Sequence, residues 1–414
     1  MWRIILAFFV PKRWRTTSYL LLLLLGTVFI FVWIAKLRSR YNIIDFGFRY
    51  EETDVWLTID EIGLNECPVC FGHNKSICRG ILERNVKLQH KNVTVTSEHW
   101  KPRAHSLWND ERISIKHFGN ASEFYKIDNE LCSLIGKINS PCRVREVAWN
   151  SFLNPSSVES AIQDTMECPS LRLMTKLKQI YSTEGVQQVN HNNMLYLTST
   201  LYLNQEPVIF QLFPAENGWP FPKLYGFCGR AVVVEDAGLP LDLFLSEPWI
   251  ERAKLALEVI KIAKRLTSNQ EHWGLYLKEV SMGNFAVSTN RTVKLVDAEQ
   301  VLVVDLTESN VTAEKKKTNN QCANTEVKCL SFFPIELCQG TIRDQNYYAV
   351  CRSVLADIGS RRGLLHSPPE ENDFKVMFHD ALTECVEAKK IRRTEAIELV
   401  MGLLQSKINQ ANVK

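Results

Sequence analysis

Two short apolar runs between residues 284 and 297 constrain the fold more than any other part of this sequence. The runs Asn284–Val287 and Val293–Val296 alternate as strands do and flank a polar turn, which predicts a β-hairpin. The hairpin opens with the amide of Asn284 and ends at the carboxylate of Asp297, and Glu279 precedes it by five residues. Carboxylate and amide oxygens are the ligands that hard cations such as Mg²⁺ prefer. The stretch therefore predicts a metal site beside bound phosphates, with Asn284 and Asp297 as the ligands.

The spacing of these side chains resembles the catalytic loop of protein kinases. There an aspartate precedes an asparagine, a hairpin and the metal-binding aspartate of a D-F-G motif. In this chain Glu279 stands in place of the catalytic aspartate, Asn284 matches the asparagine, and Asp297–Glu299 stands for D-F-G. The alternative is a surface hairpin with ordinary polar ends, and the flanking sequence has to decide between the two.

A lysine on a predicted strand is a second feature that kinases share. Residues 111–116 alternate as in a strand that ends on Lys116. In a kinase such a lysine pairs with the nucleotide phosphates and with a helix glutamate. A helix is expected over residues 122–134, with Glu123 as the expected partner and Glu130 as the alternative. The competing interpretation is a strand lysine that only faces solvent.

Two further predicted strands lead to a candidate hinge. Residues 207–213 and 230–235 are apolar runs of strand length. In a kinase the stretch that follows the second strand is the hinge whose backbone contacts adenine, so Glu235 and Gly238 become candidate nucleotide-binding residues together with the lysine. A helix is expected from about Pro248, because apolar side chains recur after it at helical spacing, at Leu255, Val259, Ile262 and Leu266.

An uncharged run near the start of the chain predicts a membrane anchor. Residues 19–35 carry no charge and are close to the lower limit of length for a membrane span. Basic residues flank the run, with an asymmetry that leans toward a cytosolic N-terminus. The alternative is a cleaved signal peptide, for which Trp33–Lys36 is a poor cleavage site. The expected topology is type II with a luminal C-terminus.

Cysteines and glycosylation sequons agree with a luminal chain. The sequence has 12 cysteines, an even number that behind a membrane signal indicates disulfides in an oxidising compartment. Cys67 and Cys70 could instead form a zinc half-site or a redox pair, but no second C-x-x-C completes a zinc site. Glycans are expected on sequons at Asn74, Asn92, Asn120, Asn290 and Asn310.

Length and charge limit the remaining classes. A chain of 414 residues fits two or three domains, or one two-lobed domain with a stem, and a net charge of +3 is too balanced for a nucleic-acid-binding surface. The expected fold class is α+β. The predicted organisation is a cytosolic tail at 1–18, the anchor at 19–35, a stem with a cysteine-rich cap at 36–100, a kinase-like N-lobe at 101–238 and a kinase-like C-lobe at 239–414.

Several motifs together resemble the divergent protein kinase domain family in its "deleted in autism" branch. They extend over nearly everything after residue 60 and comprise Cys67–Gly72, Phe213–Arg230, Tyr276–Glu299, Cys329–Phe332, Asn346–Cys351 and Gly363–Pro369. The resemblance implies a two-lobed kinase-like fold, residence in the endoplasmic reticulum or Golgi membrane or secretion after cleavage, and ATP with Mg²⁺ or Mn²⁺ as cofactor. It also implies Lys116 with Glu123 as the lysine–glutamate pair.

Two departures from the kinase pattern bear on activity. Glu279 is one methylene longer than aspartate, which moves its carboxylate by about 1 Å, and a misplacement of that size can cost about 10²-fold in rate. No glycine lies between Gly80 and Gly119 to form a glycine-rich loop over the phosphates. Both favour a pseudokinase that serves as a binding or secreted signalling module for a secretory-pathway protein or glycan, either with retained nucleotide binding or with an empty site. The alternatives are an active luminal kinase that phosphorylates a protein or glycan hydroxyl, and a structural partner that binds no nucleotide.

Overall fold

The computed structural model describes one compact unit of the chain, within Thr53–Lys414. The described residues are 55–56, 77, 86–89, 103–108, 111–117, 166–181, 197, 200–201, 204–228, 231–307 and 330–413. The predicted tail and anchor and nearly all of the cysteine-rich cap lie outside them. None of the helices in these ranges is both long and apolar enough to span a bilayer.

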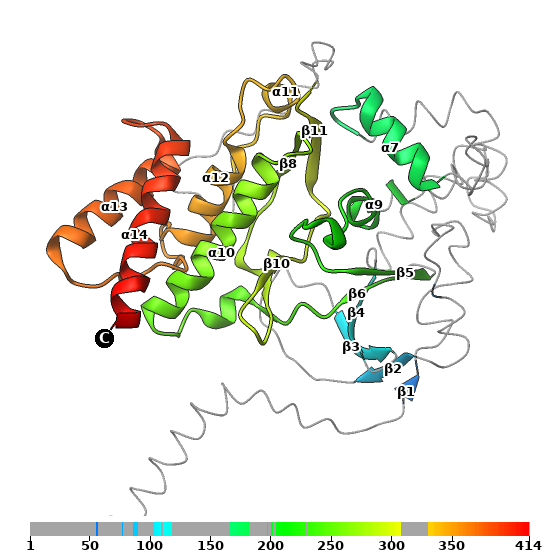
Figure 1. The fold of residues 1–414 in the computed structure, drawn as a ribbon, viewed down its shortest axis with the longest axis horizontal. Helices are drawn as coiled ribbons and strands as arrows, with labels where there is room; N and C mark the ends of the chain where they lie inside the picture. Colours follow the sequence, from blue (N-terminus) through cyan, green and yellow to red (C-terminus); the bar gives the residue numbers. More distant parts are fainter. Residues whose placement is uncertain are drawn as a thin grey trace, which may run out of the picture. The chain divides into compact units, whose positions relative to one another are not determined.

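A six-stranded antiparallel sheet forms the N-terminal part of this unit, in the order β1-β2-β3-β4-β6-β5 (Figure 1). The strand predicted to end on Lys116 is confirmed as β4 and continues for one more residue. It pairs with β6, with Lys116 opposite Val232. The strands are β1 (Val55–Trp56), β2 (Val86–Gln89), β3 (Arg103–Trp108), β4 (Glu111–His117), β5 (Leu224–Cys228) and β6 (Ala231–Glu235).

The predicted hairpin is confirmed and gains a third strand from the linker after β6. Strands β9 (Phe285–Val287) and β10 (Val293–Leu295) pair antiparallel, and β7 (Leu239–Pro240) adds to the other edge of β9. Gly238 allows this close approach, because its φ is +99° and a Cβ there would lie 2.1 Å from the carbonyl oxygen of Val287. The stretch predicted as a hinge thus connects the large sheet directly to the hairpin.

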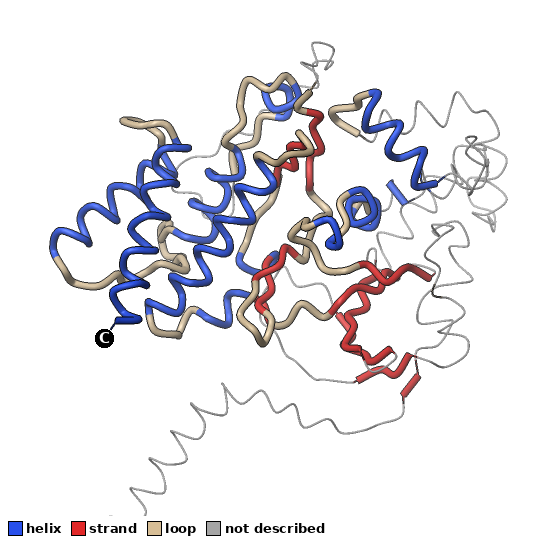
Figure 2. The backbone as a smooth tube through the Cα atoms, viewed as in Figure 1, coloured by secondary structure: helices blue, strands red, loops and turns tan. Residues whose placement is uncertain are grey.

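The C-terminal part is helical, and a two-stranded sheet of β8 (Trp273–Leu277) and β11 (Val301–Asp305) adjoins it (Figure 2). Helix α10 begins at Trp249, one residue after the predicted Pro248, and its four predicted stripe residues are all buried. It packs against both α12 and α14. The helices are α10 (Trp249–Thr267), α11 (Pro334–Cys338), α12 (Gln345–Val350) with a π-helical turn η4 (Cys351–Leu355), α13 (Asn372–Glu387) and α14 (Arg393–Val413).

The prediction of a strand over residues 207–213 is wrong, because nearly all of these residues belong to helix α9 (Glu206–Leu212). Pro207 stands in the first turn of α9, where its missing N–H has no intrahelical partner to lose. Nearly the whole helix is buried, and its middle is a continuous apolar run, Pro207–Phe210, that shows no helical period. A short apolar run of this kind cannot be distinguished from a buried strand by periodicity. Before it lies helix α7 (Leu171–Tyr181).

Disulfides confirm part of the cysteine prediction. Cys168 is bonded to Cys338 and Cys351 to Cys385, across sequence separations of 170 and 34 residues. Cys228 is also disulfide-bonded, and no cysteine in the described ranges is free. The two cross-links tie the segment before α7 to α11, and the π-helical turn to α13. Closing such long loops restricts the unfolded chain and stabilises the fold.

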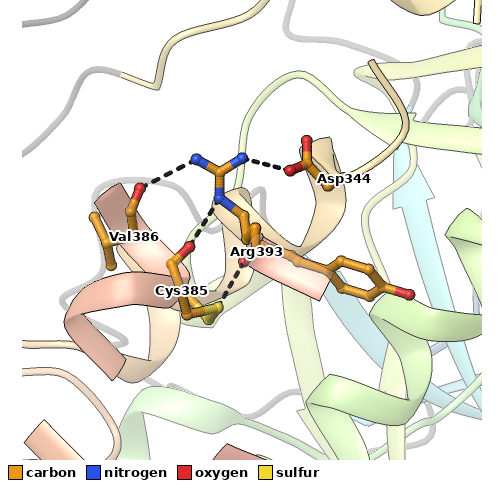
Figure 3. The surroundings of a disulfide bond; sticks show 6 residues. Asp344, Cys385, Val386 and Arg393 are labelled. Atoms are coloured by element: carbon orange, nitrogen blue, oxygen red, sulfur yellow. Dashed lines mark hydrogen bonds and ion pairs between the residues drawn. A yellow bond between two sulfur atoms is a disulfide. The ribbon is translucent and has the colours of Figure 1, made fainter. Parts of the chain in front are cut away.

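Next to the second disulfide, the side chain of Arg393 binds carbonyl groups at the C-terminal end of helix α13. Its guanidinium donates hydrogen bonds to the carbonyl oxygens of Cys385 at 2.8 Å and Val386 at 3.3 Å, and pairs with Asp344 at 2.8 Å (Figure 3). The last carbonyls of a helix have no partner inside it. One arginine therefore satisfies the end of α13 and fixes the start of α14 against α12.

We expect replacement of Gly402 by alanine to stabilise the protein. Gly402 lies exposed inside α14, and a Cβ there would meet no atom within 4 Å. Alanine in an exposed helix interior is favoured over glycine by about 1 kcal/mol. Urea unfolding of Gly402→Ala should show a gain of that size.

The matched change Gly363→Ala should act in the opposite direction. A Cβ at Gly363 would lie 2.2 Å from the carbonyl oxygen of Leu355, so the backbone of the π-helical turn would have to move. A Gly363→Ala protein as stable as the wild type would contradict the packing described for this turn.

Candidate nucleotide and metal site

Lys116 lies at the centre of the site and is almost fully buried, with 3% of its surface exposed. Its ammonium group donates to both carboxylate oxygens of Glu206 and, at 3.0 Å, to the carbonyl oxygen of Val296. A lysine ammonium has three N–H donors. The three acceptors found here use all of them, so Lys116 is held between the large sheet, helix α9 and the residue before Asp297.

Glu206 has the role that the sequence analysis gave to Glu123. Glu123 lies outside the described residues, and the carboxylate that contacts Lys116 comes from the first residue of α9 instead. The sequence contained a signal for this: a glutamate directly before a proline is typical of the first turn of a helix. It was missed because residues 207–213 were interpreted as a strand.

Several charges meet at Glu206. Burial raises the pKa of its carboxyl group, Lys116 opposes the rise, and the negative charges of Asp297 and Glu299 add to it. The carboxylate also accepts a hydrogen bond from the backbone N–H of Ala298 at 3.3 Å. The ion pair and the metal-ligand candidate Asp297 therefore belong to one electrostatic cluster.

Asn284 and Asp297 lie at the open end of the hairpin, as predicted. The N–H of Val296 donates to the carbonyl oxygen of Asn284 at 2.8 Å, which extends the β9–β10 pairing by one step and places Asp297 directly after it. The side-chain oxygen of Asn284 accepts bonds from the N–H and the hydroxyl of Ser281, both at 2.7 Å, within the 3₁₀ turn η3 (Met282–Asn284). Asn284 can bind a metal through this oxygen only by giving up one of these bonds.

The donor set suits a cation that is completed by phosphate oxygens. Asp297 is half-buried, and its Oδ1 accepts a bond from the N–H of Glu299 at 3.3 Å. Within the described ranges no three His, Cys, Asp or Glu side chains form a cluster that could hold a metal by themselves. Mg²⁺ is usually bound by one or two carboxylates plus substrate phosphates and water. Asn284 and Asp297 fit that pattern.

Asp242 is a further polar residue that the sequence analysis did not identify. It lies in the 3₁₀ turn η2 (Leu241–Phe244), which packs against η3, the turn that contains Asn284. Its Oδ1 is buried and has no hydrogen-bond partner among the residues that the structure describes. Burial raises the pKa of Asp242 against two backbone hydrogen bonds that lower it. A donor supplied by a ligand would satisfy this oxygen.

The hinge candidates lie where they were expected, but their polar groups have internal partners. The carboxylate of Glu235 pairs with Lys294 of the hairpin at 2.6 Å. The N–H of Gly238 donates to the side chain of Asp236 at 3.1 Å. Their contact with adenine stays a prediction.

Glu279 lies exposed after β8, in the loop that leads to η3. The preceding residue anchors this loop, because the side chain of Lys278 pairs with Glu167 at 2.5 Å and its N–H donates to the carbonyl oxygen of Gln300 at 2.9 Å. The hydrogen bonds that join Lys116, Glu206 and the hairpin do not include Glu279.

Only one of the five sequons, at Asn290, is in the described residues. Asn290 is exposed in the hairpin turn, and its side-chain oxygen accepts a bond from the hydroxyl of Thr292 at 2.9 Å. The remaining sequons, at Asn74, Asn92, Asn120 and Asn310, lie outside the described ranges.

Comparison with known proteins agrees with this geometry. A family model described as the protein-kinase domain of FAM69 matches residues 198–388, which include Glu206 and the whole hairpin. The human protein named Divergent protein kinase domain 2A is 31% identical in an alignment of 431 positions, which covers 94% of this chain and 95% of that protein. The chain belongs to the divergent protein kinase domain family.

Other members of the family show the same breadth of similarity. Divergent protein kinase domain 2A of Mus musculus is 32% identical, over 82% of this chain and 86% of that protein. Human Divergent protein kinase domain 2B is 24% identical, over 82% of this chain and 79% of that protein. The family resemblance expected from the sequence motifs is confirmed, and the kinase-like arrangement of a sheet, a connecting stretch and a helical part agrees with it.

We expect Lys116→Met to destabilise the protein by about 3–5 kcal/mol, because it leaves the carboxylate of Glu206 buried without its cation. The loss should depend on pH. Burial raises the pKa of Glu206 and Lys116 lowers it, so removal of the lysine raises the folded-state pKa further above the unfolded value. A raised carboxyl pKa favours the folded state at low pH, and this advantage disappears as the pH rises through the folded-state pKa.

Urea unfolding at acidic and neutral pH measures both effects, and the loss should be larger at neutral pH. The control is Lys261→Met, since Lys261 forms an exposed pair with Glu258 whose removal should cost about 0–1 kcal/mol at either pH. Equal losses for the two variants would contradict a buried ion pair at Lys116.

Proposed function

We propose that this kinase-like protein is a pseudokinase of the secretory pathway that binds ATP weakly, together with Mg²⁺ or Mn²⁺, and acts as a binding or secreted signalling module. The observation that carries the proposal is the group of Lys116, Glu206 and Asp297. A buried lysine–glutamate pair beside a carboxylate at the end of a hairpin is the arrangement that positions phosphates and their metal ion in kinases. Family membership supports it.

The residues of this chain have distinct parts in the proposed binding. Glu206 holds the ammonium group of Lys116 in place for a phosphate oxygen. Asp297 and Asn284 would be the protein ligands of the cation, and a bound cation would neutralise the negative charge of the phosphates. Asp242 accepts a hydroxyl hydrogen of the nucleotide at its unpartnered Oδ1.

Two observations favour weak binding without efficient phosphoryl transfer. The donors of Lys116 are all used inside the protein, so a phosphate must displace the carbonyl of Val296 before it can bind the lysine. Glu279 is exposed, and its extra methylene displaces a carboxylate that would have to accept the proton of a substrate hydroxyl. A secreted or luminal partner then recognises the folded domain rather than receives a phosphate.

The second candidate is an active luminal kinase that phosphorylates a protein or glycan hydroxyl. The presence of Lys116, Asn284 and Asp297 in one hairpin-centred site favours it. The catalytic base contributes less to phosphoryl transfer than positioning and charge neutralisation do, so Glu279 weakens this candidate without removing it.

A luminal location is part of the same proposal, with residues 19–35 as a signal anchor of the endoplasmic reticulum or Golgi membrane. The two disulfides between described segments support it, because disulfides persist in oxidising compartments. The exposed sequon at Asn290 is accessible to a glycan.

We expect Asp297→Ala to abolish metal-dependent ATP binding, because it removes the carboxylate that opposes the charge of the cation. Glu279→Gln should leave ATP binding unchanged within about twofold, since its carboxylate is exposed and lies outside the hydrogen-bond network of Lys116. Calorimetric titration with ATP, with and without Mg²⁺ or Mn²⁺, measures both. If Asp297→Ala binds as the wild type does, the metal site is wrong.

The same proteins separate the two candidates when phosphate transfer to a pool of luminal proteins is followed with labelled ATP. A pseudokinase gives no transfer that depends on Asp297. For an active kinase, Glu279→Asp should increase the turnover, because it restores the shorter base of the family.

We expect Asn290 to carry an N-glycan in protein made by secretory cells. Asn290→Gln and Thr292→Val each destroy the sequon and should increase electrophoretic mobility by one glycan, whereas Thr292→Ser keeps the sequon and should not. N-glycosidase should remove the difference between them. Identical mobility of all four proteins before the enzyme treatment would count against glycosylation of this turn.

A further inference from the structure

We infer that Gln205 is a positioning residue for the metal-binding carboxylate Asp297, an inference that rests on the proposed function. Gln205 immediately precedes Glu206 and is the N-cap residue of helix α9. Its side-chain amide donates to the carbonyl oxygens of Glu299 and Val301, each at 2.8 Å. An amide nitrogen has two N–H donors, so both are used on this one segment.

The two carbonyls belong to the segment that joins Asp297 to strand β11. The chain turns at Glu299 and Gln300 and enters β11 at Val301, and the one amide contacts the carbonyl groups on both sides of this turn. Glu299 is also the residue whose N–H contacts the carboxylate of Asp297, at 3.3 Å. Gln205 thus binds the carbonyl group of Glu299, and the N–H of the same Glu299 orients the carboxylate of Asp297.

Neighbouring residues hold the segment after Asp297 from two sides, and we call this arrangement the clamp. Glu206 accepts a hydrogen bond from the N–H of Ala298 at 3.3 Å, so the N-cap and the first residue of α9 contact two consecutive residues after Asp297. From the other side the N–H of Lys278 donates to the carbonyl oxygen of Gln300 at 2.9 Å. Between Asp297 and β11 every residue therefore has a backbone group tied to α9 or to the Glu279 loop.

Gln205 differs from Glu206 in what it can affect. Glu206 also holds Lys116, so its removal disturbs phosphate binding and stability together. Gln205 is half-buried and neutral, and both hydrogen bonds that its side-chain amide donates go to the metal-site segment. Its loss should weaken the metal-dependent part of nucleotide binding while the lysine–glutamate pair stays intact.

The decisive variant is Gln205→Met, which keeps the length of the side chain and removes both donors. Its matched control is Gln211→Met, because the side chain of Gln211 donates to the carbonyl oxygen of Pro207 inside the same helix. Gln205→Met should have the lower thermal midpoint of the two, because it leaves two carbonyl groups without their donor and the control leaves one. In the ligand-free Gln205→Met protein, amide hydrogen exchange should become faster at residues 298–303, and it should not in the control.

Calorimetric titration with ATP gives the functional part of the test. Gln205→Met should bind ATP with Mg²⁺ about tenfold more weakly than the wild type, because the segment after Asp297 then adopts the binding-competent arrangement in a smaller fraction of the free protein, and should bind ATP without metal as the wild type does. An equal fall with and without metal would mean a structural role only, and unchanged exchange at residues 298–303 would refute the clamp itself. A wild-type protein without metal-dependent binding would refute the proposed function, whereas a Gln205→Met protein that keeps it would refute only the role of Gln205.

Discussion

The buried ion pair between Lys116 and Glu206 is the interaction on which the arrangement of this domain depends. Removing two charges from water costs several kcal/mol for each ion, and only close, well-bonded geometry recovers it. A pair of this kind is poor evidence for stability alone. Here it fixes which residue of α9 faces the large sheet and where the segment before Asp297 runs, because the same lysine also bonds the carbonyl of Val296. The pair sets geometry, and hydrophobic burial stabilises the fold around it.

The hairpin β9–β10 carries this geometry to the rest of the chain. Its first strand, β9, pairs with β7, which begins directly after Gly238. A side chain at position 238 would collide with the carbonyl oxygen of Val287. Its turn is held from the helical part, where Arg291 pairs with Glu247 at 2.9 Å just before α10. The open end and the turn of one short hairpin are therefore tied to the large sheet and to the helical part, respectively.

The sequence predicted those parts of the fold whose local pattern matches their environment. The hairpin has a clear turn, β4 alternates apolar and polar residues, and α10 has apolar residues at helical spacing, so period and turn chemistry identify these three elements. Helix α9 was mistaken for a strand because it is buried on nearly every side and only seven residues long. Because of that error Glu206 was not recognised as a helix residue, and Glu123 was predicted in its place as the partner of Lys116. Glu206 lies 90 residues from Lys116 in sequence, so no local pattern connects the two.

Residues whose importance comes only from tertiary contact could not be found in this way. Asp242 looks like an ordinary helix-start acid in the sequence, and what marks it is a buried oxygen without a hydrogen-bond partner in the described part of the chain. Gln205 resembles any polar residue before a helix until its amide is found on two carbonyls of a distant segment. By contrast Asn284 and Asp297 were found because their spacing reflects a hairpin, a local structure that the sequence determines within about fifteen residues.

Val296 shows why phosphate and metal binding should not be independent in this site. Its carbonyl accepts from Lys116 at 3.0 Å, its N–H donates to the carbonyl of Asn284 at 2.8 Å, and Asp297 follows it in the chain. A phosphate that takes the third donor of Lys116 releases the carbonyl of Val296 and loosens the end of the hairpin at Asp297. A cation that draws Asp297 and phosphate oxygens together supplies the attraction that compensates for this loss. Nucleotide without metal must break the bond between Lys116 and Val296 with no cation to compensate, so this site should bind ATP more tightly with the cation than without it.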